Sequence, residues 1–227
     1  MDYSPIYLRF DSALRAASSA EPDHFLQESS GAVTAFIEDD DEETHVGTFR
    51  TYFVDVVGAA NAGKSAHDVF DTSGSTYGYL GALYCDDAWN FRPAVMKALK
   101  AHQLTTSPSL LILDRLLIAP EWRGRGIGLH ALVGLMHWLQ PGAGVAAIKP
   151  YPLQFEAGHQ DPHDPERPWI DGFKGNFRTC RAKLCRYYAQ LGFKRVPHTG
   201  YMVRRCDQGL PNIQELPSRL ASSSSSS

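Results

Sequence analysis

Cysteine is scarce in this chain. Its 227 residues include four cysteines, at Cys85, Cys180, Cys185 and Cys206, and no two of them form a Cys-x-x-Cys pair. Such sparse cysteines exclude a disulfide scaffold in a chain of this length and a zinc site built on cysteine pairs. We therefore expect reduced, mostly structural thiols and no bound metal.

Long apolar runs and a strong excess of one charge are also lacking. No window approaches 18 consecutive apolar residues, and residues 1–5 show neither region of a secretory signal, so we expect a cytoplasmic protein with no membrane partner. Lys and Arg number 22 against 25 Asp and Glu, which gives a formal net charge of -3. That balance excludes a polycation that binds nucleic acid over its whole surface, so any such contact would be local.

Three stretches differ in composition from the rest of the chain, whose 43% hydrophobic residues can supply a core. Six consecutive acids at Glu38–Glu43 repel one another and predict a solvated hairpin turn. Residues 156–175 are rich in Pro, His, Asp and Gly, which is typical of an inserted surface loop. The serine run at the end predicts a disordered tail at 217–227, after a single domain over residues 1–216.

Periodicity along the chain predicts strands and helices in alternation. Leu129, Leu132, Val133 and Met136 form the apolar stripe of a helix, whereas Leu110–Ile118 is an apolar run typical of a central strand. The expected elements are strands at 32–37 and 44–57 around the acidic turn, mostly helical structure at 65–100, a strand at 110–118, a helix from about 127 to 140, a strand at 145–148, a helix ending near Gly192, and strands at 193–196 and 200–204.

One glycine-rich segment, Gly58–Ser65, fits the phosphate-loop pattern Gly-x-x-x-x-Gly-Lys-Ser. In a phosphate loop the main-chain amides hold phosphates, Lys64 contacts the terminal phosphates and Ser65 binds magnesium. The surroundings fit poorly, because only a short helix follows and no later strand ends in the expected Asp. A phosphate-loop nucleotide-binding protein is therefore kept as an alternative.

A second glycine-rich segment, Arg123–Gly128, lies between the predicted central strand and the predicted helix that begins near Ile127. Its alternating glycines allow the main chain to approach a ligand closely, and a helix N-terminus attracts anions. The segment therefore predicts an anion site. A Rossmann dinucleotide site is disfavoured, because no acidic residue ends a following strand about 20 residues on.

The stretch Leu113–Leu132 resembles the acyl-CoA-binding motif of the GNAT superfamily of N-acetyltransferases, with Arg123, Gly126 and Gly128 at its three defining positions. Downstream, Tyr188-Ala-Gln-Leu-Gly-Phe193 is similar to the Tyr-x-x-x-Gly-Phe junction of that family, and the stretch after residue 148 resembles its bacterial members. The resemblance covers residues 110–202. It implies an α/β fold with a mixed, mostly antiparallel central sheet and helices on both faces.

The resemblance also implies acetyl-CoA as cosubstrate, transfer of its acetyl group directly to a primary amine, and no metal. The pyrophosphate would be held by main-chain amides of the glycine loop, and the pantetheine arm by the end of the central strand. The residues that it assigns to the cofactor are Leu117, Ile118, Arg123, Gly124, Arg125, Gly126, Ile127, Gly128 and Leu129.

Two residues are candidates for proton transfer. By resemblance, Tyr188 protonates the departing thiolate, and a phenol with a pKa of about 10 suits that task; the alternative is a core aromatic. Asp114 occupies a position that often carries a general base, and apolar neighbours would raise its pKa. Its alternative is an ion pair with Arg115, and water could serve as the base instead.

Two further features leave the acceptor open. The inserted loop carries His159, Asp161, His163 and Asp164. The prolines at positions 162 and 165 of the same loop argue against a helix that would bring these side chains together around a metal. A basic stretch without acids could be a solvated face, attract CoA, or bind an RNA acceptor, as in a toxin that acetylates aminoacyl-tRNA. The basic residues are Lys174, Arg178, Arg181, Lys183, Arg186, Lys194, Arg195, Arg204 and Arg205. A module that binds CoA without catalysis is the remaining alternative.

Overall fold

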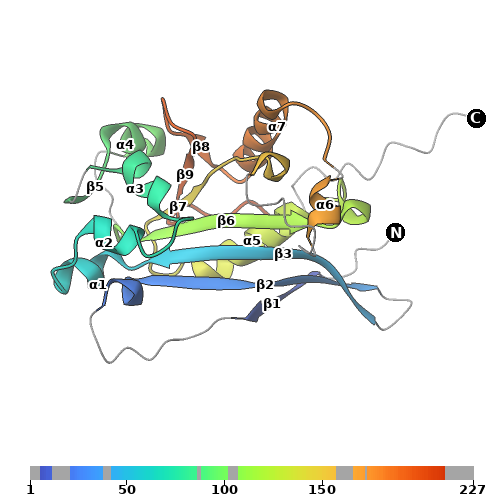
Figure 1. The fold of residues 1–227 in the computed structure, drawn as a ribbon, viewed down its shortest axis with the longest axis horizontal. Helices are drawn as coiled ribbons and strands as arrows, with labels where there is room; N and C mark the ends of the chain where they lie inside the picture. The colour runs from blue at the N-terminus through green and yellow to red at the C-terminus, as the bar shows by residue number, and fades with distance from the viewer. Residues whose placement is uncertain are drawn as a thin grey trace, which may run out of the picture.

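The computed structural model describes residues 6–11, 21–37, 42–85, 88–101, 107–156, 166–171 and 173–212. Its main feature is a seven-stranded sheet with the order β1-β2-β3-β6-β7-β9-β8 (Figure 1). The strands are β1 (Ile6–Asp11), β2 (Leu26–Ile37), β3 (Glu42–Val54), β6 (Leu110–Ile118), β7 (Val145–Ile148), β8 (Lys194–Arg195) and β9 (Met202–Arg205), and β4 (Tyr84–Cys85) pairs with β5 (Ala88–Phe91) in a separate ribbon.

Only one neighbouring pair in the sheet, β6 with β7, is parallel. The long pair β2–β3 is antiparallel and brackets the acidic turn, so the predicted hairpin is confirmed. The predicted strands at 110–118 and 145–148 are confirmed residue for residue. The expected mixed, mostly antiparallel sheet is therefore the observed one.

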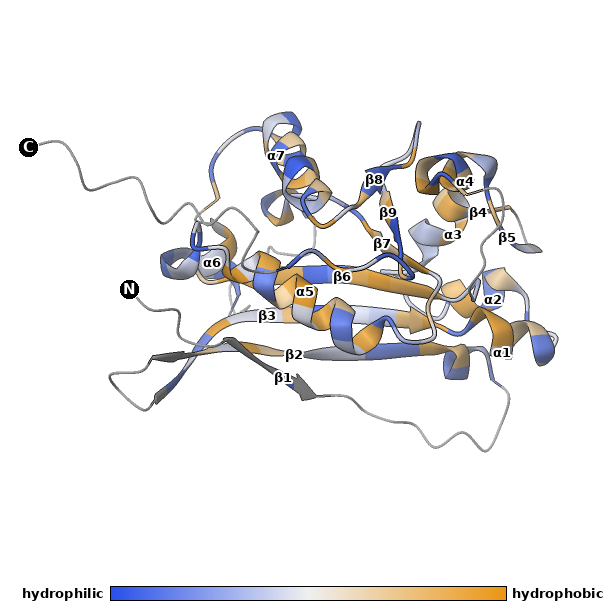
Figure 2. Ribbon diagram, turned by 180° about the vertical axis from the view of Figure 1, so that it is seen from behind, coloured by the Kyte–Doolittle hydropathy of each residue, from blue (hydrophilic) through white to orange (hydrophobic). Residues whose placement is uncertain are grey.

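Helices cover both faces of the sheet. Helix α5 lies across one face in Figure 2, with α7 above the same sheet. The α-helices are α1 (Val56–Asn61), α2 (Ala66–Phe70), α3 (Tyr77–Leu83), α4 (Pro93–Leu99), α5 (Ile127–Leu139), α6 (Arg167–Asp171) and α7 (Phe177–Ala189). Short 3-10 turns occur at Pro22–Phe25, Pro120–Trp122 and Leu153–Phe155.

The core divides at β6 because successive side chains of a strand point to opposite faces. Leu110 and Ile112 pack into a cluster with residues of α1 to α4, whereas Leu111 and Leu113 pack with α5 and with Cys185 of α7. All four side chains are almost fully buried. The central strand thus carries two cores, which agrees with its continuous apolar sequence.

One predicted boundary is wrong, and two predicted segments contain an additional element. The second strand does not reach Val57, because Asp55 accepts a hydrogen bond from the Gly58 amide at 2.9 Å and begins α1. The mostly helical segment at 65–100 also contains the β4–β5 ribbon. The segment at 156–175 is not all loop, since it contains α6.

Some expectations were incomplete or lie outside the described residues. Strand β1 was not predicted, although Ile6, Leu8 and Phe10 alternate with polar or amphipathic residues as an edge strand does. The Ser-rich tail and the histidines of the inserted loop fall outside the described ranges.

Candidate active site

The glycine loop joins the end of β6 to the start of α5. Gly124 and Gly126 have φ angles of 78° and 81°, in the left-handed region that favours glycine, and Gly126 is the residue that immediately precedes α5. A side chain at either position would meet nothing within 4 Å, so the glycines are needed for backbone conformation.

The amides of the loop lack acceptors. Within the described part of the chain, the main-chain N–H groups of residues 124–128 donate no hydrogen bond to another residue, and no side chain caps α5. The helix bonds begin only at Leu129 and His130, whose amides both donate to the Gly126 carbonyl. Five consecutive free amides at a helix N-terminus are suited to bind an anion.

Arg123 organises the loop through its side chain. Its Nε donates to the Ile118 carbonyl at 2.7 Å and its Nη2 donates to the Trp169 carbonyl at 2.6 Å. The guanidinium also lies 3.8 Å from the centre of the Phe173 ring. The arginine of the motif therefore joins the end of β6 to α6, so its side chain is already engaged, whereas Arg125 is exposed.

One edge of β6 is open beyond Leu113. Strand β7 pairs with residues 110–113 only, and β3 pairs along the other edge as far as Ile118. The Ala119 amide donates to Val46 of β3, so the alternation of strand hydrogen bonds directs the main-chain groups of Ile118 to the open edge. The same alternation directs those of Leu116 outward too.

The two strand residues assigned to the pantetheine arm are therefore placed differently. Ile118 presents its amide to the open edge, while its carbonyl is bound by Arg123. Leu117 pairs with Thr48 of β3 and its side chain is buried in the core. Sequence reasoning did not single out Leu116. The signal that could have found it is the alternation of strand residues, because Leu116 lies two residues before Ile118 and faces the same edge.

Asp114 occupies an irregularity in β6. Arg50 pairs with Arg115 and Thr51 pairs with Leu113, so Asp114 is an extra residue opposite β3. Such a bulge bends the strand and redirects a side chain. It occurs one residue beyond the last pair of β6 with β7, where the two strands separate (Figure 1).

The carboxylate of Asp114 is paired with Arg50, which the sequence did not predict. Both Nε and Nη2 of Arg50 lie 2.8 Å from Oδ2 of Asp114. Burial raises the pKa of Asp114 and is the largest effect; Arg50 lowers the pKa, Glu156 raises it and Arg115 lowers it. A carboxyl with a raised pKa beside an open strand edge is suited to accept a proton.

Tyr187 and Tyr188 lie side by side on α7, with their ring centres 5.5 Å apart. Burial raises the pKa of both phenols, which keeps them protonated. A Cβ placed on Gly128 would lie 2.4 Å from the Tyr187 hydroxyl, so this hydroxyl contacts the first turn of α5. Tyr187, which sequence reasoning did not single out, therefore lies beside the helix turn that follows the glycine loop.

Helix α6 and Glu166, the residue before it, contact side chains of β3 and β6. The hydroxyl of Thr48 donates to Glu166, and Nε of Arg115 lies 3.3 Å from Oε2 of Glu166. The ring centres of His45 and Trp169 are 5.4 Å apart. These contacts hold part of the inserted segment against β3 and β6.

The competing phosphate-loop segment has a different geometry. Gly58 lies inside α1, and the amides of Ala62, Gly63 and Lys64 donate to carbonyls of the same segment. Ser65 caps α2, which has only five residues. Because its amides are already bonded, the segment lacks the donors that a phosphate loop supplies.

The structure separates the basic stretch into two groups. Arg204 is 2% exposed and donates to the carbonyls of Gln208 and Gly209, and Arg205 pairs with Asp207. Arg181 is half-buried and donates to the Thr199 carbonyl at 3.4 Å, so all three arginines have structural partners. The exposed cations are Lys174, Arg178, Lys183, Arg186, Lys194 and Arg195.

Comparison of the chain with protein-family models, with curated proteins and with solved structures yields no match. Among the described residues, no group of three His, Cys, Asp or Glu side chains is arranged to hold a metal ion. In the same ranges, no helix combines the length and the apolar character needed to cross a bilayer.

Proposed function

We propose that this protein is an N-acyltransferase that moves the acetyl group of acetyl-CoA to a primary amine. The observation that carries the proposal is the run of free amides at residues 124–128, continuous with the open edge of β6. An anion bound at these amides can be attached to an extended chain that follows the strand. The resemblance to the GNAT family agrees with this arrangement.

The distances along β6 suit such a ligand. From Ile118 to Asp114 the strand advances four residues, or about 14 Å at roughly 3.4 Å per residue. The pantetheine arm is an extended chain with two amide groups, and the outward main-chain groups of Leu116 and Ile118 can bind amides. With its pyrophosphate at Gly124–Gly128, the thioester would lie near Asp114.

Asp114 and Tyr188 then have complementary tasks. The amine nitrogen attacks the thioester carbonyl carbon, a C–N bond forms and Asp114 takes the proton from nitrogen. When the C–S bond breaks, the electron pair leaves on sulfur, which takes a proton from Tyr188. The raised pKa of Tyr188 keeps this phenol protonated beforehand, and the same dry surroundings make the thiolate more basic.

A thermal-shift titration tests the proposal. Acetyl-CoA at 100 times its dissociation constant stabilises the folded protein by about 2.7 kcal/mol, which raises Tm by roughly 5–10 °C in a domain of this size. Magnesium with ATP is the control and should leave Tm unchanged, because the amides of Ala62, Gly63 and Lys64 are already bonded within the Gly58–Ser65 segment. No shift with acetyl-CoA would overturn the proposal, and a shift with ATP alone would restore the phosphate-loop alternative.

A further inference from the structure

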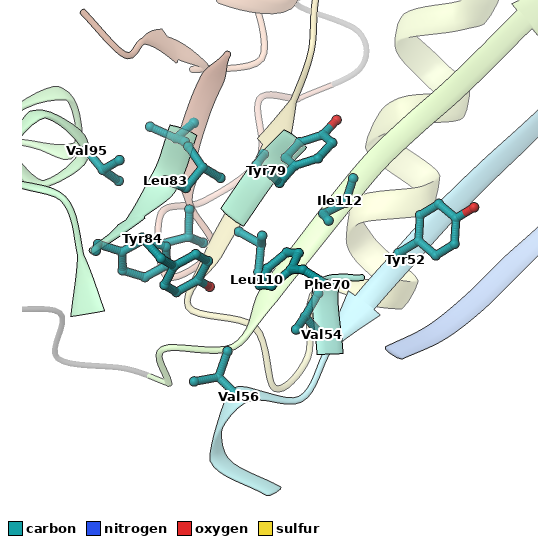
Figure 3. Packing of buried hydrophobic residues seen from close by; sticks show 14 of the residues in the cluster. Tyr52, Val54, Val56, Phe70, Tyr79, Leu83, Tyr84, Val95, Leu110 and Ile112 are labelled. Carbon is teal, nitrogen blue, oxygen red and sulfur yellow. The ribbon is translucent and has the colours of Figure 1, made fainter. Parts of the chain in front are cut away.

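Two tyrosines of the same core cluster differ in one respect. Tyr79 of α3 and Tyr84 of β4 are 1% and 0% exposed and both belong to the cluster drawn in Figure 3. The Tyr84 hydroxyl donates to the Pro108 carbonyl at 3.2 Å. The Tyr79 hydroxyl donates its proton to no acceptor among the described residues, although buried hydroxyls in folded proteins are almost always hydrogen-bonded.

The Tyr79 hydroxyl points out of the apolar cluster (Figure 3). Apart from burial, Asp114, Tyr201 and Tyr188 raise the pKa of this phenol, and a hydrogen bond from the main-chain amide of Lys149 to the phenol oxygen lowers it. The rings of Tyr79 and Tyr201 meet edge to face with their centres 4.7 Å apart. These neighbours come from β6, α7 and the segments beside β7 and β9.

Their common location is the place where β6 and β7 separate. The last pair of these strands is Leu113 with Ile148, so Asp114 and Lys149 are the next residues on each strand. Tyr79 belongs to the cluster on one face of the sheet and Tyr188 packs against the cluster on the other. The Tyr79 hydroxyl is nevertheless near enough to Asp114 and Tyr188, the two groups to which the proposed function assigns proton transfer, for both of them to raise its pKa.

We propose that the Tyr79 hydroxyl donates a hydrogen bond to the carbonyl oxygen of the acyl group while the group is transferred. This inference rests on the proposed function, which places the thioester near Asp114. In the free protein the hydroxyl proton has no acceptor among the described residues, and substrate would supply one.

The chemistry requires a donor that keeps its proton. As the amine adds to the carbonyl carbon, the π pair of the C=O bond moves onto oxygen, which becomes negatively charged. Tyr79 stabilises that charge by a hydrogen bond, since burial among Asp114 and two other phenols keeps the proton on its own oxygen. The C=O bond re-forms as the C–S bond breaks, so Tyr79 returns to its starting state without gaining or losing a proton.

The test compares Tyr79→Phe with Tyr84→Phe as the matched control. The assay follows release of the CoA thiol from acetyl-CoA, with hydroxylamine as a small acceptor. Removal of one such donor typically lowers kcat by 10²–10³, so we expect about this loss in Tyr79→Phe, with the Kd of acetyl-CoA and the KM of hydroxylamine unchanged. Its Tm should stay close to that of the wild type, because the Tyr79 hydroxyl donates no hydrogen bond that could be lost.

Tyr84→Phe should show the opposite pattern. Loss of its bond to Pro108 should lower Tm by about 2–4 °C and leave kcat unchanged. An unchanged kcat in Tyr79→Phe, or a fall in its Tm like that of Tyr84→Phe, would overturn the inference. So would a higher KM for hydroxylamine at unchanged kcat, which would make Tyr79 an acceptor contact.

The wild type separates this inference from the proposed function. If wild-type protein binds acetyl-CoA in calorimetry and releases thiol, the proposed function stands, and only the Tyr79→Phe results decide the role of the hydroxyl. Absence of acetyl-CoA binding by the wild type would refute the proposed function, and the role of Tyr79 along with it.

Discussion

Replacement of Gly128 by alanine should create a clash with one identifiable atom. The position is helical and its φ angle is ordinary, so the change itself favours the helix by about 1 kcal/mol. The new Cβ would lie 2.4 Å from the Tyr187 hydroxyl, 3.5 Å from Cγ1 of Ile118 and 3.6 Å from Cζ of Tyr187. Only the contact with the hydroxyl oxygen is too short.

The free energy follows from these distances. To relieve the contact, the half-buried Tyr187 ring must move against Tyr188 and the surrounding core, and overpacking of this kind typically costs about 1–3 kcal/mol. After subtraction of the helix preference, Gly128→Ala should lower the free energy of unfolding by roughly 0–2 kcal/mol. In a Tyr187→Phe background the atom nearest to the new Cβ is at an ordinary van der Waals distance. Gly128→Ala should then raise the free energy of unfolding by about 1 kcal/mol.

Urea denaturation of the wild type, the two single variants and the double variant measures this difference. The coupling free energy between Gly128→Ala and Tyr187→Phe should be about 1–3 kcal/mol, with the slope m equal in all four proteins. If Gly128→Ala has the same effect in both backgrounds, within about 0.5 kcal/mol, the Tyr187 hydroxyl is not against α5 and the argument fails.

Three other predictions concern the proposed reaction. Arg50→Gln removes a charge that lowers the pKa of Asp114, so the acid limb of the pH profile of kcat/KM should move to higher pH, whereas Arg205→Gln should leave the limb in place. Gly126→Ala forces alanine into a left-handed conformation, which should lower the free energy of unfolding by roughly 1–2 kcal/mol and weaken acetyl-CoA binding in calorimetry; full affinity would contradict the role of the loop amides. Tyr188→Phe should reduce kcat by about 10²-fold or more at unchanged Kd for acetyl-CoA, and an unchanged kcat would leave this phenol a core aromatic.

The parts of the site that lie close together in sequence could be predicted from it. An apolar run, three alternating glycines and an amphipathic stripe identify β6, the loop and α5 in order, because each signal is local. Gly124 and Gly126 do adopt the left-handed conformations that make glycine necessary. The anion site follows directly from these local signals.

The groups that complete the site could not be predicted in this way. Arg50 and Asp114 are 64 residues apart, and only the pairing of β3 with β6 brings them together. The register irregularity that redirects Asp114 has no local sequence marker. Tyr79 belongs to a segment expected to be mostly helical, but the surroundings of its hydroxyl depend on how α3 packs against β6, β7 and α7. Tertiary contacts decide such features, and periodicity carries no information about them.

The placement of α1 to α4 has a consequence for the order of folding. Strands β3 and β6 are antiparallel neighbours, yet all of residues 55–109 lie between them. A connection about ten times longer than a tight hairpin adds roughly 2 kcal/mol of closure entropy, and contacts so distant in sequence slow folding. The β2–β3 hairpin can form from local contacts alone, whereas the centre of the sheet must wait for the intervening helices to collapse. Asp114 and Tyr79 would therefore come together only in the last, slowest stage of folding.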